Sequence, residues 1–276
     1  FERFCLGRPA EEMPRITPNI CGVCPTPHNM AATKALDDLY SVSPTETARL
    51  VRQLQYNAFM LEDHFIHFFF LSAPDFVVGP IANPALRNIV GVIQKVGIDV
   101  GKKVIDIRKR CREIMTLIGS KPAHPEGGLP GGVPRGVKEE ERVWIKQTAN
   151  DAVAMTQFAL DIFKDVVLKN KEYVDLVMND AYRLQTYYMG LVDDSGNVSF
   201  YDGTIKIVDP TGREYAHFHP SDYIDHIGEW VEPWTYVRLT HLRKVGWGGL
   251  VEGDNTSLYR VGPLARLNVA KDMATS

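Results

Sequence analysis

Apolar residues that recur at helical spacing over long stretches are the feature that most constrains the fold of this chain. The clearest stretch starts at Ser43–Glu46, which has the pattern of a capping box with a proline in its first turn. Another starts at Thr26-Pro27, where threonine is a good N-cap and proline suits the first helical position. We expect long helices at about residues 26–39, 43–71, 83–118 (opened by Asn83-Pro84 and bent near Gly101) and 137–168.

The second half of the chain has a different pattern. Residues 198–207 are predicted to be a β-hairpin around Asp202-Gly203, a dipeptide that favours tight turns, and Asp209–Gly212 is predicted to be a further turn. Residues 124–136 hold five glycines and three prolines and are expected to be irregular loop. Long helices followed by short strands predict a mainly α fold with a small β portion. We expect one domain over residues 1–276, helical to about 190, β-containing over about 191–260, with 261–276 as the start of a further segment.

The charge balance excludes some classes of partner. The chain has 31 Lys and Arg against 34 Asp and Glu, a net charge of −3, which disfavours nucleic acid because phosphate binding needs clustered positive charge.

No apolar run is long enough to span a bilayer, and no export signal opens the sequence. Four cysteines do not make a secreted disulfide framework, so we expect a cytoplasmic setting. The chain starts without Met and its last apolar run is cut short, so we expect a piece of a longer protein.

The run Cys21-Gly22-Val23-Cys24 carries the most specific chemistry. A CxxC places two thiols where both can bind one metal or share a pair of metals. Cys24 lies close to the expected start of a helix, where the helix dipole favours the thiolate that ligates metal. His28, in the first turn of that helix, is placed to donate a hydrogen bond to a ligand sulfur without binding the metal itself.

Other interpretations stay open on the residues alone. A structural zinc site would need two further ligands, and no second CxxC or His pair lies at zinc-finger spacing. A thioredoxin-like pair should follow a strand, whereas this one follows a proline-bearing loop. Cys5 and Cys111 have no motif around them. His64 and His67, three residues apart among phenylalanines, are expected to be packed core histidines rather than metal ligands.

Further runs accompany the CxxC along the chain: Phe1-Glu2, Gly7–Pro9, Met13–Pro18, Ile20–Cys24 with His28, Asp63–Phe68, His124-Pro125, Pro130–Val133 and Val261–Arg266. Together these runs resemble the large (catalytic) subunit of nickel–iron hydrogenases, in the version of the cytoplasmic multi-subunit group. They follow one another in the family's order, which is far more specific than a single CxxC. The resemblance implies a long-helix core of the nickel-dependent hydrogenase large-subunit type.

The resemblance also implies roles for particular residues. Cys21 would be a terminal nickel ligand and Cys24 would bridge nickel and iron, with carbon monoxide and cyanide on the iron. Soft thiolates suit low-valent transition metals and can share one sulfur between two of them. Glu2 lies where the family places a carboxylate ligand of a magnesium ion, and oxygen ligation fits that hard cation. The implied reaction is the reversible oxidation of H2 to protons and electrons.

Some parts of such an enzyme would have to come from elsewhere. In the family a second CxxC supplies two more thiolates. Residues 1–276 contain no second CxxC, so this fragment by itself is expected to be inactive. Asn19 stands where the family usually has arginine. Cys5 and Cys111 are too few for an iron–sulfur cluster, so we expect electrons to leave through an iron–sulfur small subunit bound near Arg8–Thr17, with further acceptor subunits.

Two alternatives of other classes remain. One is a non-catalytic electron-transfer scaffold related to the quinone-facing subunit of respiratory complex I. Such relatives generally lack the metal-binding cysteines, so Cys21 and Cys24 count against it. The other is a small zinc- or iron-binding module that is complete as it stands.

Overall fold

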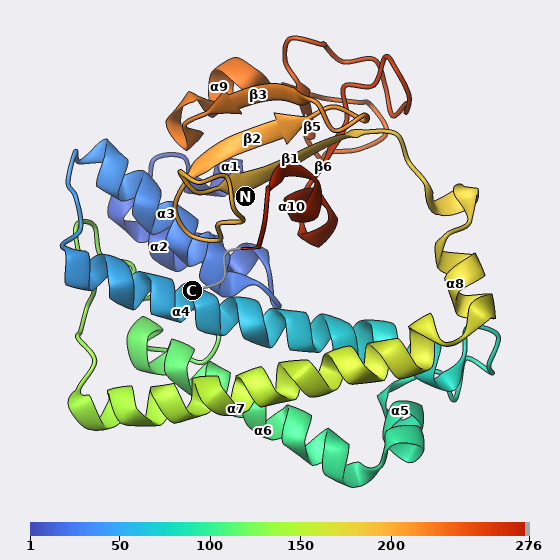
Figure 1. Cartoon of the computed structure of the whole chain (residues 1–276). Coiled ribbons are helices and arrows are strands. Elements are labelled where there is room, and N and C mark those ends of the chain that lie inside the picture. Colours follow the sequence, from blue (N-terminus) through green and yellow to red (C-terminus); the bar gives the residue numbers. More distant parts are fainter. Residues whose placement is uncertain (274–276) are drawn as a thin grey trace. The chain divides into compact units, whose positions relative to one another are not determined.

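The computed structural model describes residues 1–273, which form two compact units, Phe1–Leu176 and a second unit that starts at Val177. Unit 1 is helical and unit 2 contains the strands (Figure 1), which confirms the predicted mainly α fold with a small β portion. The first strand starts at Tyr187, close to the change predicted at about residue 190. The assignment of residues 1–276 to a single domain stays a prediction, and residues 274–276 of the predicted segment 261–276 lie outside the described residues.

Unit 1 is built on long helices joined by loops. Its helices are α1 (Glu2–Cys5), α2 (Met13–Ile16), α3 (Pro25–Leu39), α4 (Glu46–Ile66), α5 (Ile89–Val96), α6 (Ile98–Gly119), α7 (Glu139–Phe163) and the start of α8 (Lys171–Val177). Helix α4 packs against α3 and α6, and α6 packs against α5 and α7. Three of these helices, α4, α6 and α7, form the long layer at the bottom of Figure 1.

The apolar spacing that predicts α4 is only partly confirmed by its packing. Val51, Ala58, Phe59 and Phe65 are buried, as is Phe69 in the π-helical turn that follows, whereas Leu50, which shares the spacing of Ala58 and Phe65, is 51% exposed. The buried residues divide between two core clusters, one shared with residues of α6 and the start of α7, the other with residues of α6 and the middle of α7. Because α4 contributes side chains to both clusters, it is the central helix of this core. Full burial of one large apolar side chain contributes about 1.5–3 kcal/mol to the stability of the fold.

Both predicted helix starts were displaced by two residues. In α4 the N-cap is Thr45, whose side chain accepts a hydrogen bond from the Ala48 N–H, and not Ser43 as the predicted capping box requires. Helix α3 starts two residues earlier than predicted, with Cys24 in the N-cap position and Pro25 first in the helix.

The predicted long helix over residues 83–118 was wrong in two respects. Asn83-Pro84 lies in a turn, and the helical run starts later, where the Asn88 side chain accepts from the N–H groups of Val90 and Gly91. The run then breaks at Gly97, whose φ of 94° separates α5 from α6, and not at Gly101. A positive φ of this kind costs glycine little, and that is why the break falls there.

The prediction that His64 and His67 are packed in the core was also wrong. Both are exposed. Their ring nitrogens make local contacts, 2.6 Å from the Met60 carbonyl oxygen and 3.2 Å from the Ser72 hydroxyl. The buried face of this segment is formed by Phe65 and Phe69, so the histidines turn outward.

Unit 2 contains a four-stranded sheet in the order β3-β2-β1-β6 and a separate β4–β5 pair. The strands are β1 (Tyr187–Val192), β2 (Thr204–Val208), β3 (Glu214–Phe218), β4 (Ile227–Trp230), β5 (Leu239–Leu242) and β6 (Tyr259–Arg260), with α9 (Tyr223–His226) and α10 (Pro263–Val269). Helix α10 packs against β1.

The hairpin predicted around Asp202-Gly203 was wrong. Strand β2 pairs antiparallel with β1, so residues 198–203 belong to the loop between them, and Val198 only forms an isolated bridge with Val192. The predicted turn at Asp209–Gly212 is confirmed and joins β2 to β3: the Gly212 N–H donates to the Asp209 carbonyl.

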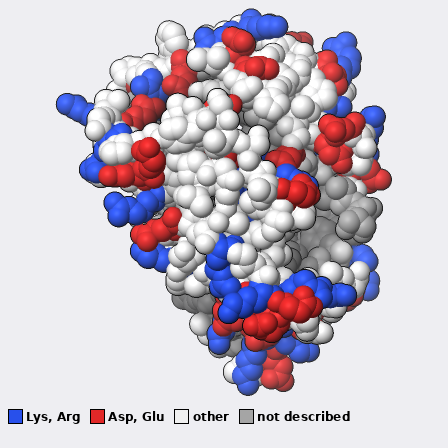
Figure 2. All heavy atoms as spheres, turned by 90° about the vertical axis from the view of Figure 1, so that its left-hand side faces the viewer, with Lys and Arg blue, Asp and Glu red and all other residues white. Residues whose placement is uncertain are grey.

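In Figure 2 basic and acidic side chains are interspersed, and the described part of this face carries no continuous basic area. Within residues 1–273 no helix combines the length and the apolar character needed to cross a bilayer.

Candidate metal centre

The two cysteines of the CxxC lie where the N-terminal turns lead into α3. A short 3-10 turn, Thr17–Ile20, ends at Cys21, whose backbone is extended, and Cys24 occupies the N-cap position of α3. Proline at the first helical position is tolerated because the N–H that it lacks would have no helical partner. This tight connection brings the Cα atoms of Cys21 and Cys24 to 5.4 Å from each other.

The side chains of Cys21, Cys24 and His28 converge. The structure joins the two sulfurs as a disulfide, and the ligand atoms of all three residues lie within 4.8 Å of one another. All three residues are half-buried. His28 lies four residues after Cys24, so both occupy the same face of the first turn of α3. No other group of three potential metal-binding side chains converges in this way among the described residues.

Once the disulfide is reduced, the two sulfurs fit a soft or borderline transition metal, because thiolates are ligands that such metals prefer. The backbone N–H of Cys24 donates to the Cys21 sulfur at 3.0 Å. That contact and the positive end of α3 both stabilise a thiolate. The roles predicted for Cys21, Cys24 and His28 stay predictions.

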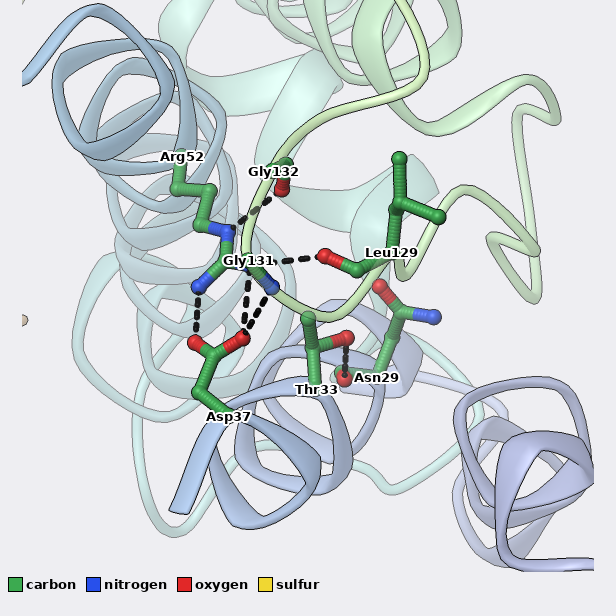
Figure 3. Close-up of polar contacts among 7 residues, drawn as sticks. All are labelled: Asn29, Thr33, Asp37, Arg52, Leu129, Gly131 and Gly132. Carbon is green, nitrogen blue, oxygen red and sulfur yellow. Dashed lines mark hydrogen bonds and ion pairs between the residues drawn. The ribbon is translucent and has the colours of Figure 1, made fainter. Parts of the chain in front are cut away.

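A row of buried polar side chains runs along α3, on the helix that starts at the CxxC. Asn29, Thr33 and Asp37 are 3%, 2% and 8% exposed. They are spaced four residues apart, so they share one helix face, and we name them the α3 polar stripe. Figure 3 shows the stripe beside the loop of residues 129–132. The sequence predictions missed it, because polar residues at helical spacing usually mark the exposed face of a helix.

The stripe binds the loop over residues 124–136, which is irregular as predicted. The Asn29 side-chain N–H donates to the carbonyl oxygens of Pro14 at 2.7 Å and Pro125 at 3.1 Å. Eight residues later, Asp37 Oδ1 accepts from the Gly131 N–H at 2.7 Å (Figure 3). The loop is therefore held by its backbone along the length of α3.

A cleft of about 660 Å³ opens beside the segment that leads into Cys21. Its lining includes Phe1, Phe4, Arg8, Arg15, Lys121 and His124. The charged lining side chains are three basic and one acidic, Glu126, which is paired with Lys121 at 2.7 Å. Asn19, the residue that departs from the resembled family, also lines the cleft and donates to the carbonyl oxygens of Arg15 and Ile16.

Glu2 lies apart from the converging group. It is exposed at the start of α1. The magnesium-binding role predicted for it has no second converging protein ligand among the described residues, so it stays a prediction.

Comparison with known proteins identifies the class. Residues 1–85 match the family described as nickel-dependent hydrogenase. The chain belongs to this family and has its large-subunit fold.

The relatives that it resembles are components of larger enzymes. The chain is 46% identical, over 275 residues, to an iron-sulfur subunit of the F420-non-reducing hydrogenase of Archaeoglobus profundus. It is 42% identical to a vhu subunit of the F420-non-reducing hydrogenase of Methanocaldococcus jannaschii. All of the chain is covered in both comparisons, and it spans 56% and 63% of the two relatives. A crystal structure of an NAD+-reducing nickel–iron hydrogenase in the H2-reduced state matches all of the chain and 59% of the solved chain, with a TM-score of 0.90 and 30% identity.

Proposed function

We propose that the chain is part of the catalytic subunit of a cytoplasmic nickel–iron hydrogenase that oxidises H2 reversibly to protons and electrons. The observation that carries this proposal is the convergence of the ligand atoms of Cys21, Cys24 and His28 within 4.8 Å, inside the segment that matches the family. In the reduced protein Cys21 would be a terminal nickel ligand and Cys24 would bridge nickel and iron. The centre, with carbon monoxide and cyanide on its iron, supplies the heterolytic cleavage of H2 when bound.

The chain's own residues prepare the two sulfurs for metal. The N–H of Cys24 and the start of α3 stabilise negative charge on them. His28 would hydrogen-bond a ligand sulfur and keep its orientation. A reducing cytoplasm keeps such thiols available.

Two further thiolates would come from outside these residues. Cys111 cannot supply one, because it is 1% exposed and packs in the core cluster of Phe65 and Phe69, whereas Cys24 packs against the other cluster of unit 1. Cys5 stands alone in α1. We propose a second CxxC elsewhere in the complete protein, and Glu2 as one ligand of a magnesium ion whose other ligands are also outside this chain.

Metal analysis of the complete protein tests the proposal. Nickel and iron should copurify with the reduced, mature protein and should be lost in Cys21→Ser and Cys24→Ser. Cys5→Ser is the matched control, since it removes a thiol outside the converging group, and it should retain both metals. Zinc alone would favour a structural module, and absence of any metal from the wild type would favour the electron-transfer scaffold; either result contradicts the proposal.

We also propose that an iron–sulfur small subunit docks at the basic cleft. Arg8, Arg15 and Ile16, which belong to the predicted docking segment, line it, and a reduced cluster bound by four thiolates is anionic. The complete large subunit by itself should show little H2-dependent dye reduction, and coexpression with the small subunit should restore it. Arg15→Glu should weaken copurification of the two subunits, while Lys146→Glu, an exposed change on α7, should not. Full activity from the verified partner-free protein would contradict the partnership.

A further inference from the structure

We propose that the α3 polar stripe is a positioning device that fixes the rotation and axial position of α3, so that Cys24 and His28 are held in a metal-ready arrangement before metal binds. For its functional meaning this inference rests on the metal role proposed for Cys21 and Cys24. Its structural content, that Asn29 ties α3 to the segment before Cys21 and to the loop, can be tested separately.

The stripe makes hydrogen bonds to other segments at two positions along α3, at Asn29 and at Asp37. Asn29 and Asp37 lie eight residues apart, which corresponds to a rise of about 12 Å. Each end makes hydrogen bonds of 2.7–3.1 Å to main-chain groups of other segments. Two such anchors on one face oppose both sliding and rotation of α3, because either movement breaks bonds that tolerate only a few tenths of an ångström.

Between these anchors the loop lies directly on the stripe. A Cβ built on Gly128 would come within 2.3 Å of Thr33 Oγ1 and 2.5 Å of the Pro14 Cβ atom. Only glycine permits so close an approach of backbone to side chain. A helix that contacted the loop only through apolar side chains could shift along it by a fraction of a turn at little cost in free energy. The close contact at Gly128 permits only one position of α3 relative to the loop.

Asn29 connects the two flanks of the CxxC. It follows His28 directly and lies five residues after Cys24, while its acceptor Pro14 belongs to α2, in the segment that leads into Cys21. The Thr17 hydroxyl, in that same segment, shares its proton between the carbonyl oxygens of Met13 at 2.9 Å and His28 at 3.1 Å. Hydrogen bonds at His28 and Asn29 therefore connect the segment before Cys21 to the helix that starts after Cys24.

The test is a Co2+ titration of the complete, reduced, metal-free protein, with the Cys21→Ser/Cys24→Ser double variant as background. Asn29→Leu keeps the approximate shape and removes the donor. Met30→Ala is the matched control, since Met30 is the next residue of α3 and equally buried at 4%, and its truncation destabilises the protein without removing the tie. We expect Asn29→Leu to weaken Co2+ binding by roughly 10-fold or more, as losses of orienting partners do, and Met30→Ala to leave it within about twofold of wild type at the same folded fraction.

A second pair of variants covers the case in which Asn29→Leu does not fold. Gly128→Ala pushes the loop off the stripe, and Gly136→Ala, with nothing within 4 Å of its added methyl group, is its control. Only Gly128→Ala should weaken Co2+ binding. If the wild type binds Co2+ and both members of either pair bind it with equal affinity, the positioning role is refuted.

Hydrogen exchange separates the inference from the proposed function. Backbone amides of the first two turns of α3 should exchange faster in Asn29→Leu than in Met30→Ala at equal overall stability. Should wild type bind no Co2+ above background while this difference is present, the metal role fails and the positioning of α3 stands. Equal exchange in the two variants would overturn the inference whatever the metal does.

Discussion

Arg52 and Asp37 form a buried two-point ion pair. Arg52 Nη1 lies 2.5 Å from Asp37 Oδ2 and Nη2 lies 3.2 Å from Oδ1, with the side chains 3% and 12% exposed. The guanidinium also donates to the carbonyl oxygens of Gly132 at 3.0 Å and Leu129 at 2.8 Å (Figure 3). Helices α3 and α4 and the glycine-rich loop therefore meet at one pair of charges.

Removal of Arg52 should destabilise the protein strongly. Arg52→Met keeps most of the volume but leaves the Asp37 carboxylate buried without its partner, a change that costs about 3–5 kcal/mol. Urea unfolding followed by the helical circular dichroism signal should show this loss. Arg49→Met, three residues earlier at an exposed pair with Glu46, should change the unfolding free energy little. Equal effects of the two variants would contradict the structural role of the buried pair.

The cap of α4 should have a smaller, local effect. Thr45→Ala removes the acceptor of the Ala48 N–H, and loss of such a cap costs about 1 kcal/mol. Thr45→Ser should restore most of the stability because serine is an equally good cap. Thr47→Ala, an exposed change in the same turn, is the control for altered helix propensity. The free energies of unfolding of the three variants check the assignment.

Cys111 should be unreactive in the native protein. Burial raises the pKa of its thiol to about 11, so only about a thousandth of it is thiolate, the reactive form, near pH 8. Brief iodoacetamide treatment at that pH, mapped by mass spectrometry, should label the half-buried Cys5 and leave Cys111 unmodified. Both should be labelled in denaturant. Rapid native labelling of Cys111 would show that this part of the core opens readily.

The turn at Asp209 should make unit 2 sensitive to acid. The Thr211 hydroxyl, which donates to Asp209 Oδ1 at 2.6 Å, is the main reason why the pKa of this carboxyl falls to about 2. Because folding lowers the pKa, the ionised carboxylate stabilises the fold fully above its ordinary pKa of 3.8, and this contribution is lost as pH falls towards 2. Asp209→Asn should therefore lower the thermal midpoint at pH 6, and the difference from wild type should shrink between pH 4 and pH 2. Thr211→Val should follow the same trend; a difference that is constant over this range would contradict it.

Local sequence patterns predicted much of unit 1. The presence of α4 depends on the spacing of its own apolar residues, so it is readable without the fold, although its cap lies at Thr45 and not at Ser43. The CxxC belongs to the same class, since its short spacing along the chain suffices to bring Cys21 and Cys24 together. The start of α3 was misplaced because Thr26 has the chemistry of a cap, yet it is 3% exposed and its hydroxyl contacts the Met115 sulfur across the core.

Other features needed the tertiary structure. The pairing of β2 with β1 was missed because Asp202-Gly203 has the local pattern of a tight turn. In the structure a longer loop connects β1 to β2 and places Leu191 opposite Ile205. His64 and His67 were misjudged because the helix face that is buried is set by the helices packed against it, and Phe65 and Phe69 fill that face.

The sequence by itself determined that unit 1 is mainly helical, the mainly α class and the proximity of the CxxC to its histidine, because each depends on spacing within a few turns of chain. Tertiary structure alone decided what holds that motif in place. Asn29 and Asp37 look like ordinary polar helix residues until residues 125–132, almost a hundred positions later, lie against them. Hydrogen bonds between such distant segments have no local signature, since their partners are backbone groups that every residue carries.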